Sequence, residues 1–157
     1  MTIDETTLLF FDSSCLVAAA GSPTGGSSVL LAICARGFLK GAVSHGVLAE
    51  AEGNILTNLA LPARIRYHQE ILSMPLIVAP VPSAFERETA AAITGAKDAH
   101  VLAAALNAGA QFLITLDKGL ISRIAQEEEL SIHALSPGAF ITTYLPTHPA
   151  YPSIRPG

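Results

Sequence analysis

The sequence has only two cysteines, Cys15 and Cys34. They do not form a C-x-x-C pair, and neither lies in a His-rich neighbourhood, so the spacing expected of a thiol-based metal or redox motif is missing. We therefore expect both thiols to be reduced and to behave as small apolar side chains in a core.

Long apolar runs and a basic surface signature are also missing. No stretch approaches the roughly 18 apolar residues of a membrane span, and the first residues, Met1 to Glu5, are acidic where a signal peptide would be basic. These features predict a soluble, cytoplasmic protein without a membrane partner. The net charge of -4 argues against a general nucleic-acid coat protein. It is compatible with a nuclease, because acidic metal ligands add negative charge that bound cations reverse locally.

Apolar residues are abundant: half of the 157 residues are hydrophobic and only 14% are charged. This composition predicts one domain with a large core. Short apolar runs alternate with segments of helical spacing, which predicts a three-layer α/β/α fold with a central, mainly parallel sheet. The expected strands are 8–11, 41–44, 76–78, 112–115 and 130–133; the expected helices are 27–36, 47–59, 64–72, 84–93, 98–108 and 121–126. We expect a domain over 1–145 and a Pro-rich, loose C-terminal tail over 146–157.

Four acidic residues fall where these elements meet. Asp12 and Asp117 each follow a strand, Asp98 opens a helix, and Glu50 lies in about the first turn of another helix. Ligands of parallel sheets bind beyond the carboxyl ends of the strands, so all four acids are expected at that edge. Taken singly, each acid has a purely structural explanation as a turn former, a helix cap or a solvated helix residue.

Clustered carboxylates repel, so such a site must take up protons or cations. Hard oxygen ligands favour Mg²⁺ or Mn²⁺, and these ions also bind substrate phosphates. The acids therefore predict a divalent-metal site that hydrolyses a phosphodiester. No histidine pair has zinc spacing, and no G-x-G-x-x-G follows a strand, so a zinc site and a dinucleotide site are unsupported.

Five segments in this order resemble the motifs of PIN domains. Each is weak alone, but their order and spacing over roughly residues 7–145 are fairly specific. They are Phe11–Ala19 around Asp12, Ser44–Glu50, Asp98–Ala105, Phe112–Lys118 with its Thr-x-Asp, and the closing Ser136–Phe140.

The resemblance implies a PIN-like fold and a Mg²⁺- or Mn²⁺-dependent ribonuclease that cuts single-stranded RNA. Many small bacterial relatives are toxins of toxin–antitoxin pairs, which implies an antitoxin partner and a homodimer. Asp12, Glu50, Asp98 and Asp117 would be metal ligands and Thr115 would orient them, with Ser13 or Ser14 bonding nearby.

Two features of the resemblance leave alternatives open. Glu52 competes with Glu50 for the second motif, although the spacing from Ser44 favours Glu50. Many relatives have a further Asp where this chain has Gly119, so a second metal site is weak or absent. The alternative function is a catalytically weak or inactive PIN-like module that binds RNA or a protein partner.

Overall fold

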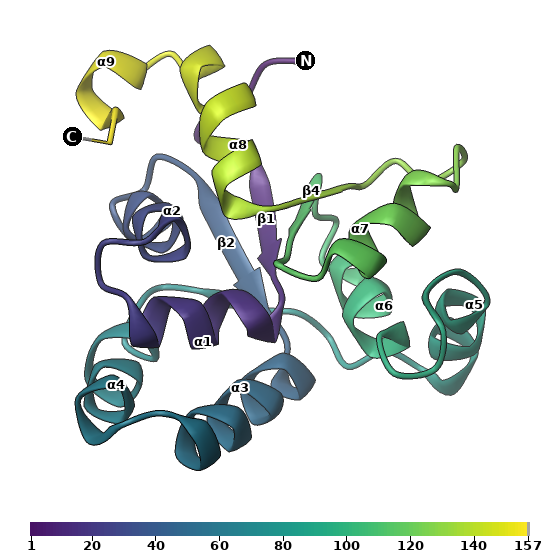
Figure 1. Cartoon of the computed structure of the whole chain (residues 1–157). Coiled ribbons are helices and arrows are strands. Elements are labelled where there is room, and N and C mark those ends of the chain that lie inside the picture. Colours follow the sequence, from purple (N-terminus) through teal and green to yellow (C-terminus); the bar gives the residue numbers. More distant parts are fainter. Residues whose placement is uncertain (157) are drawn as a thin grey trace.

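A five-stranded sheet, entirely parallel, forms the centre of the computed structural model, which describes residues 1–156. The strand order is β3-β2-β1-β4-β5, so β1 is central and the chain crosses over between neighbours. In Figure 1, β1 and β2 lie between a group formed by α1–α4 and a group formed by α5–α7. The predicted α/β fold is confirmed. The strands are β1 Leu8–Phe11, β2 Lys40–Val43, β3 Ile77–Val78, β4 Phe112–Ile114 and β5 His133–Leu135.

Side-chain caps set where several helices begin. Ser44 accepts a hydrogen bond from the amide of Val47 at the start of α3, and Ser83 and Glu86 form a reciprocal capping box at α5. The helices are α1 Ser13–Gly21, α2 Gly26–Ala35, α3 His45–Asn58, α4 Leu61–Arg66, α5 Ala84–Thr94, α6 Ala99–Asn107, α7 Lys118–Ala125, α8 Pro137–Thr143 and α9 Tyr151–Ile154, with a π-helical turn η1 Tyr67–Ile71 and a 3₁₀ turn η2 Leu145–Thr147.

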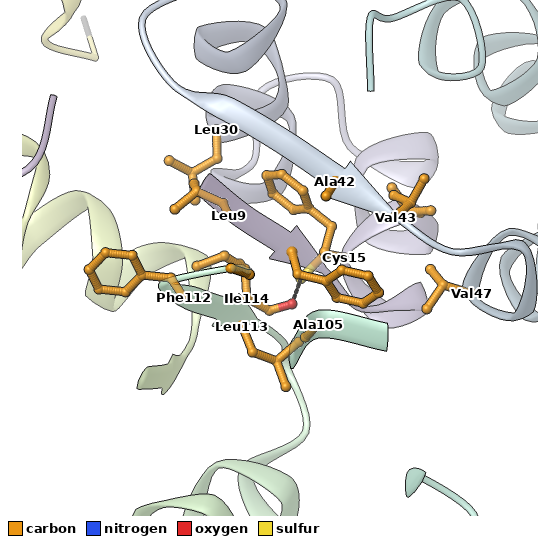
Figure 2. Packing of buried hydrophobic residues seen from close by; sticks show 14 of the residues in the cluster. Leu9, Cys15, Leu30, Ala42, Val43, Val47, Ala105, Phe112, Leu113 and Ile114 are labelled. Carbon is orange, nitrogen blue, oxygen red and sulfur yellow. Dashed lines mark hydrogen bonds between the residues drawn. The ribbon is translucent and has the colours of Figure 1, made fainter. Parts of the chain in front are cut away.

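The core is built on the two faces of the sheet. Phe10 and Phe11 point to opposite faces and both are fully buried, because helices cover both sides. Cys15 lies beside them and its thiol donates a 3.3 Å hydrogen bond to the carbonyl oxygen of Ile114, drawn as a dashed line in Figure 2. Both cysteines are buried and free, as expected.

The last strand was predicted three residues too early. Leu130 donates its amide to the carbonyl of Glu127 and closes a turn, so it is not available for a strand. Pairing with β4 begins only at His133, whose amide bonds the carbonyl of Gln111 at 3.0 Å. The apolar Ile132 is buried without being part of the strand, which is why hydrophobicity alone misplaced the element.

The C-terminal segment is not the loose extension that its prolines suggested. Leu145 and Ile154 are buried, and a ring nitrogen of the buried His148 lies 2.7 Å from the carbonyl oxygen of Phe38, just before β2. The amide of Ile3 also bonds the hydroxyl of Thr147. The tail therefore packs along the edge of the sheet at which β1 and β2 begin.

Among residues 1–156, no single helix is long and apolar enough to cross a membrane; α1 and α2 meet the length and hydropathy criteria only as a pair bent by 101°.

Candidate metal centre

Asp12 lies at the carboxyl end of the central strand and is only 7% exposed. It occupies the N-cap of α1, where its Oδ1 accepts the amide of Ser13 at 2.7 Å. Its Oδ2 accepts the hydroxyl of Thr115 at 2.7 Å and that of Ser14 at 3.2 Å. A nearly buried carboxylate requires such partners, and these three fix its orientation.

Thr115 connects the ends of β1 and β4. It is fully buried, and while its hydroxyl donates to Asp12 it accepts the amide of Asp117 at 3.1 Å. The hydroxyl of Ser14 accepts the amide of Leu116 at 3.1 Å, which ties α1 to the same loop. The hydroxyl of Thr115 therefore links the carboxylate of Asp12 to the backbone amide of Asp117.

Asp117 is the N-cap of α7, and its Oδ1 accepts the amide of Leu120 at 3.1 Å. From the sequence, the structural alternative for Asp117 was a turn residue, whereas the structure makes it a helix cap. Capping uses one oxygen and does not prevent the other from binding an ion.

Asp98 stands immediately before α6 and makes no side-chain cap there. Its Oδ2 instead accepts a hydrogen bond from Nη2 of Arg123 at 3.2 Å, in an ion pair between α6 and α7. Burial raises the pKa of Asp98 above its ordinary value, and the negative charges of Asp117 and Asp12 raise it further, while Lys97 and Arg123 oppose the shift. The carboxylates of Asp12 and Asp117, which follow β1 and β4, are therefore close enough to act electrostatically on Asp98.

Glu50 approaches the same edge from α3. Its Oε2 accepts the hydroxyl of Ser13 at 3.3 Å, and its Oε1 pairs with Nε2 of His100, two residues after Asp98. It lies in the second turn of α3, not the first, because the helix begins at His45. Glu52 points elsewhere: its carboxylate lies 4.0 Å from the ring of His68.

The four acids do not form a single closed cluster. Within residues 1–156, no three His, Cys, Asp or Glu side chains lie close enough together to enclose a metal ion. Like charges repel, and two of the acids contact nitrogen groups instead: Asp98 pairs with the guanidinium of Arg123, and Glu50 contacts the ring of His100. The donor set still suits Mg²⁺ or Mn²⁺, because it consists of carboxylate oxygens from neighbouring elements, one of which is held by Thr115.

A cavity of about 200 Å³ opens beside Glu50. It is lined on the α3 side by His45 and Gly46, on the α5 side by Arg87, and by the ring of His100. The exposed Val81 completes an apolar wall. The cavity places ionisable nitrogen groups and an apolar surface next to Glu50.

Sequence reasoning missed Arg123 and gave His100 little weight. A signal for Arg123 was present, since it lies four residues after Gly119 and therefore on the same face of α7. For His100 the nearest signal was its place two residues after Asp98 in the third motif.

A family model described as PIN domain matches residues 9–119, which is more than half of the chain and includes all four acids. The chain belongs to the PIN domain family. The resemblance drawn from the sequence motifs is thereby confirmed, and the members of this family are generally nucleases.

Solved structures share the PIN fold at low identity. VapBC2 from Rickettsia felis, bound to a DNA fragment from its promoter, is 17% identical with a TM-score of 0.62, covering 83% of this chain and 100% of that one. PAE2754 from Pyrobaculum aerophilum is 22% identical with a TM-score of 0.57, over 83% and 84% of the two chains. VapC20 from Mycobacterium tuberculosis, a sarcin–ricin loop cleaving toxin, is 17% identical with a TM-score of 0.53, over 79% and 98%. No functionally curated protein matches the chain.

Proposed function

We propose that this PIN domain is a divalent-metal-dependent endoribonuclease that cuts single-stranded RNA. The observation that carries the proposal is geometric: three hydrogen bonds hold the nearly buried carboxylate of Asp12 at the carboxyl edge of the sheet, and one of the donors, Thr115, also accepts the amide of Asp117. A fold that keeps mutually repelling carboxylates together retains them for a function, and cation binding is the simplest one.

In this proposal Asp12, Asp98, Asp117 and Glu50 hold Mg²⁺ or Mn²⁺. The bound ion would supply Lewis-acid stabilisation of phosphate charge and lower the pKa of an attacking water. Thr115 keeps Asp12 in one orientation, and Ser13 holds Glu50 toward the same edge. The ligands thus come from separate elements, and hydrogen bonds from Thr115 and Ser13 position two of them, Asp12 and Glu50, without a bound ion.

Cleavage of a single-stranded RNA oligonucleotide tests the proposal directly. We expect cleavage with Mn²⁺ or Mg²⁺, none in excess chelator, and the same product ends at each cut. A duplex of the same sequence should be cut more slowly, because a recessed acidic site reaches a phosphate in a duplex only by distorting it. Full activity in chelator would contradict the mechanism.

A catalytically weak, RNA-binding or protein-binding module is the second candidate. The contact of Glu50 with the ring of His100 and the ion pair of Asp98 with Arg123 favour it, since both occupy oxygens that a metal ion would need. RNA binding without cleavage at any divalent-ion concentration would decide for this candidate.

We further propose that the chain is the toxin of a toxin–antitoxin pair acting in the cytoplasm. Among the similar structures, VapC20 is named as a toxin. VapBC2, and FitAcB, which is from Neisseria gonorrhoeae, carry composite names. Expression of this chain alone should arrest growth, and co-expression of the product of the adjacent gene should relieve the arrest. A homodimer also remains a prediction.

A further inference from the structure

Arg123 lies where Gly119 leaves space beside the acids. A Cβ atom at position 119 would meet Asp117 Oδ1 at 3.3 Å and Arg123 Nη1 and Nη2 at 3.8 and 3.9 Å. The guanidinium therefore lies over a backbone position that has no side chain of its own. From there it reaches Asp98, to which it donates the 3.2 Å hydrogen bond.

Arg123 already supplies a positive charge beside one of the proposed ligands. Its guanidinium carries one permanent positive charge in direct contact with Asp98. A second divalent ion that used Asp98 as a ligand would have to displace the guanidinium and would be repelled by it.

The guanidinium is also accessible to a substrate. The side chain of Arg123 is 45% exposed, whereas that of Asp98 is 16% exposed, so the arginine forms the outer side of the pair. A planar guanidinium has five N–H donors and one bond to Asp98 leaves others free to contact phosphate oxygens.

We propose that Arg123 is the fixed cation of this centre: it takes the place of a second metal ion, contacts a non-bridging oxygen of the RNA phosphate, and limits the centre to one divalent ion. This inference rests on the proposed metal-dependent nuclease function and adds a residue and an ion stoichiometry to it.

The test is a Mn²⁺ titration of the full chain by electron paramagnetic resonance or calorimetry, with cleavage of single-stranded RNA measured at saturating Mn²⁺. The wild type should bind one ion. Arg123→Gln should bind that ion more tightly, by roughly threefold to thirtyfold, because a competing cation is removed. The same variant should cleave RNA at least about tenfold more slowly, because the phosphate loses a charged donor.

These opposite changes separate the proposed role from a structural one, since a merely misfolded centre would lose both properties together. Arg123→Lys should show intermediate cleavage. Lys40→Gln removes the same charge from the opposite edge of the sheet, at the first residue of β2, and should change neither measurement. The double variant Gly119→Asp with Arg123→Gln should bind two ions.

Three results would overturn this inference without affecting the proposed function. They are unchanged Mn²⁺ affinity in Arg123→Gln, a parallel loss of Mn²⁺ affinity and cleavage in that variant, and two ions bound to the wild type. A wild-type chain that binds no Mn²⁺ would overturn the proposed function with it.

Discussion

At the residue scale, Asp12 is the most constrained member of the candidate centre. Its two oxygens accept three hydrogen bonds, from Ser13, Ser14 and Thr115, in a nearly buried position. An asparagine has nearly the same shape but offers one acceptor oxygen and no negative charge. Asp12→Asn therefore keeps the size of the side chain but removes its charge and at least one of the three hydrogen bonds.

We expect Asp12→Asn to abolish Mn²⁺ binding, measured by calorimetry, because the charged oxygen ligand is removed. The matched control is Asp4→Asn, which makes the same substitution before β1, at the opposite edge of the sheet. Unchanged affinity in Asp12→Asn would show that Asp12 is not a ligand.

Asp98 gives a prediction about pH as well as activity. The pKa of Asp98 is raised in the folded chain, so ionisation of this carboxyl disfavours folding. The protonated side chain contributes its full stability below the ordinary pKa of 3.8. This contribution is lost as pH rises through the raised pKa of the folded chain. Metal-free Asp98→Asn should therefore melt at the same or a higher temperature than the wild type at neutral pH, with the difference disappearing near pH 3.

The same Asp98→Asn variant should lose RNA cleavage by about 100-fold or more, since a ligand is removed. Thermal unfolding in chelator and cleavage in Mn²⁺ measure the two effects separately. A variant that is clearly less stable at neutral pH would indicate that the pair with Arg123 outweighs the burial and repulsion at Asp98.

At the scale of elements, α3 and α6 meet at a glycine. A Cβ atom on Gly46 would lie 2.9 Å from Nδ1 of His100, the residue whose other ring nitrogen pairs with Glu50. The close approach of the two helices thus depends on a missing side chain, and it positions the His100–Glu50 pair. Neither helix shows this requirement in its own sequence.

Gly46→Ala should displace the His100 ring and lower the free energy of unfolding by about 1 kcal/mol through overpacking. The control is Gly53→Ala in the same helix, where a Cβ meets nothing within 4 Å. That change should raise the free energy of unfolding by roughly 0.5–1 kcal/mol through helix propensity alone. Urea denaturation measures both, and equal stabilisation by the two alanines would refute the proposed packing constraint.

At the scale of the whole molecule, the two buried thiols report on global unfolding. Burial raises the pKa of Cys15 and of Cys34 to about 12, with the charge of Asp12 adding to the effect at Cys15. Thiol reagents attack the thiolate, so neither cysteine should react in the native state at neutral pH.

Alkylation should therefore follow the fraction of unfolded chain as urea is increased. The unfolded thiols ionise near 9, well below the folded ones, so the free energy of unfolding should fall as pH rises from about 9 toward 12. Rapid alkylation of either cysteine without denaturant would contradict this picture of the core.

Much of this molecule follows from signals within a few residues of one another. Local hydrophobic period and capping chemistry set three of these features: the buried run before Asp12, the Thr-x-Asp at 115–117, and the helix start at Ser44. The sequence alone therefore determined the parallel α/β class and the edge of the sheet at which the acids lie. Family membership followed from the same motifs. Local patterns were less reliable for β5 and the tail, because pairing and burial there depend on distant partners such as Gln111 and Phe38.

Only the tertiary structure decided how the acids are partnered. Each of these contacts joins residues from different helical segments. Glu50 contacts Ser13 and His100, Glu52 lies near His68, and Asp98 pairs with Arg123. Their contact depends on how α3, α6 and α7 pack around the sheet, and no periodicity within one helix encodes that packing. The charge at the candidate centre is therefore a property of the folded arrangement.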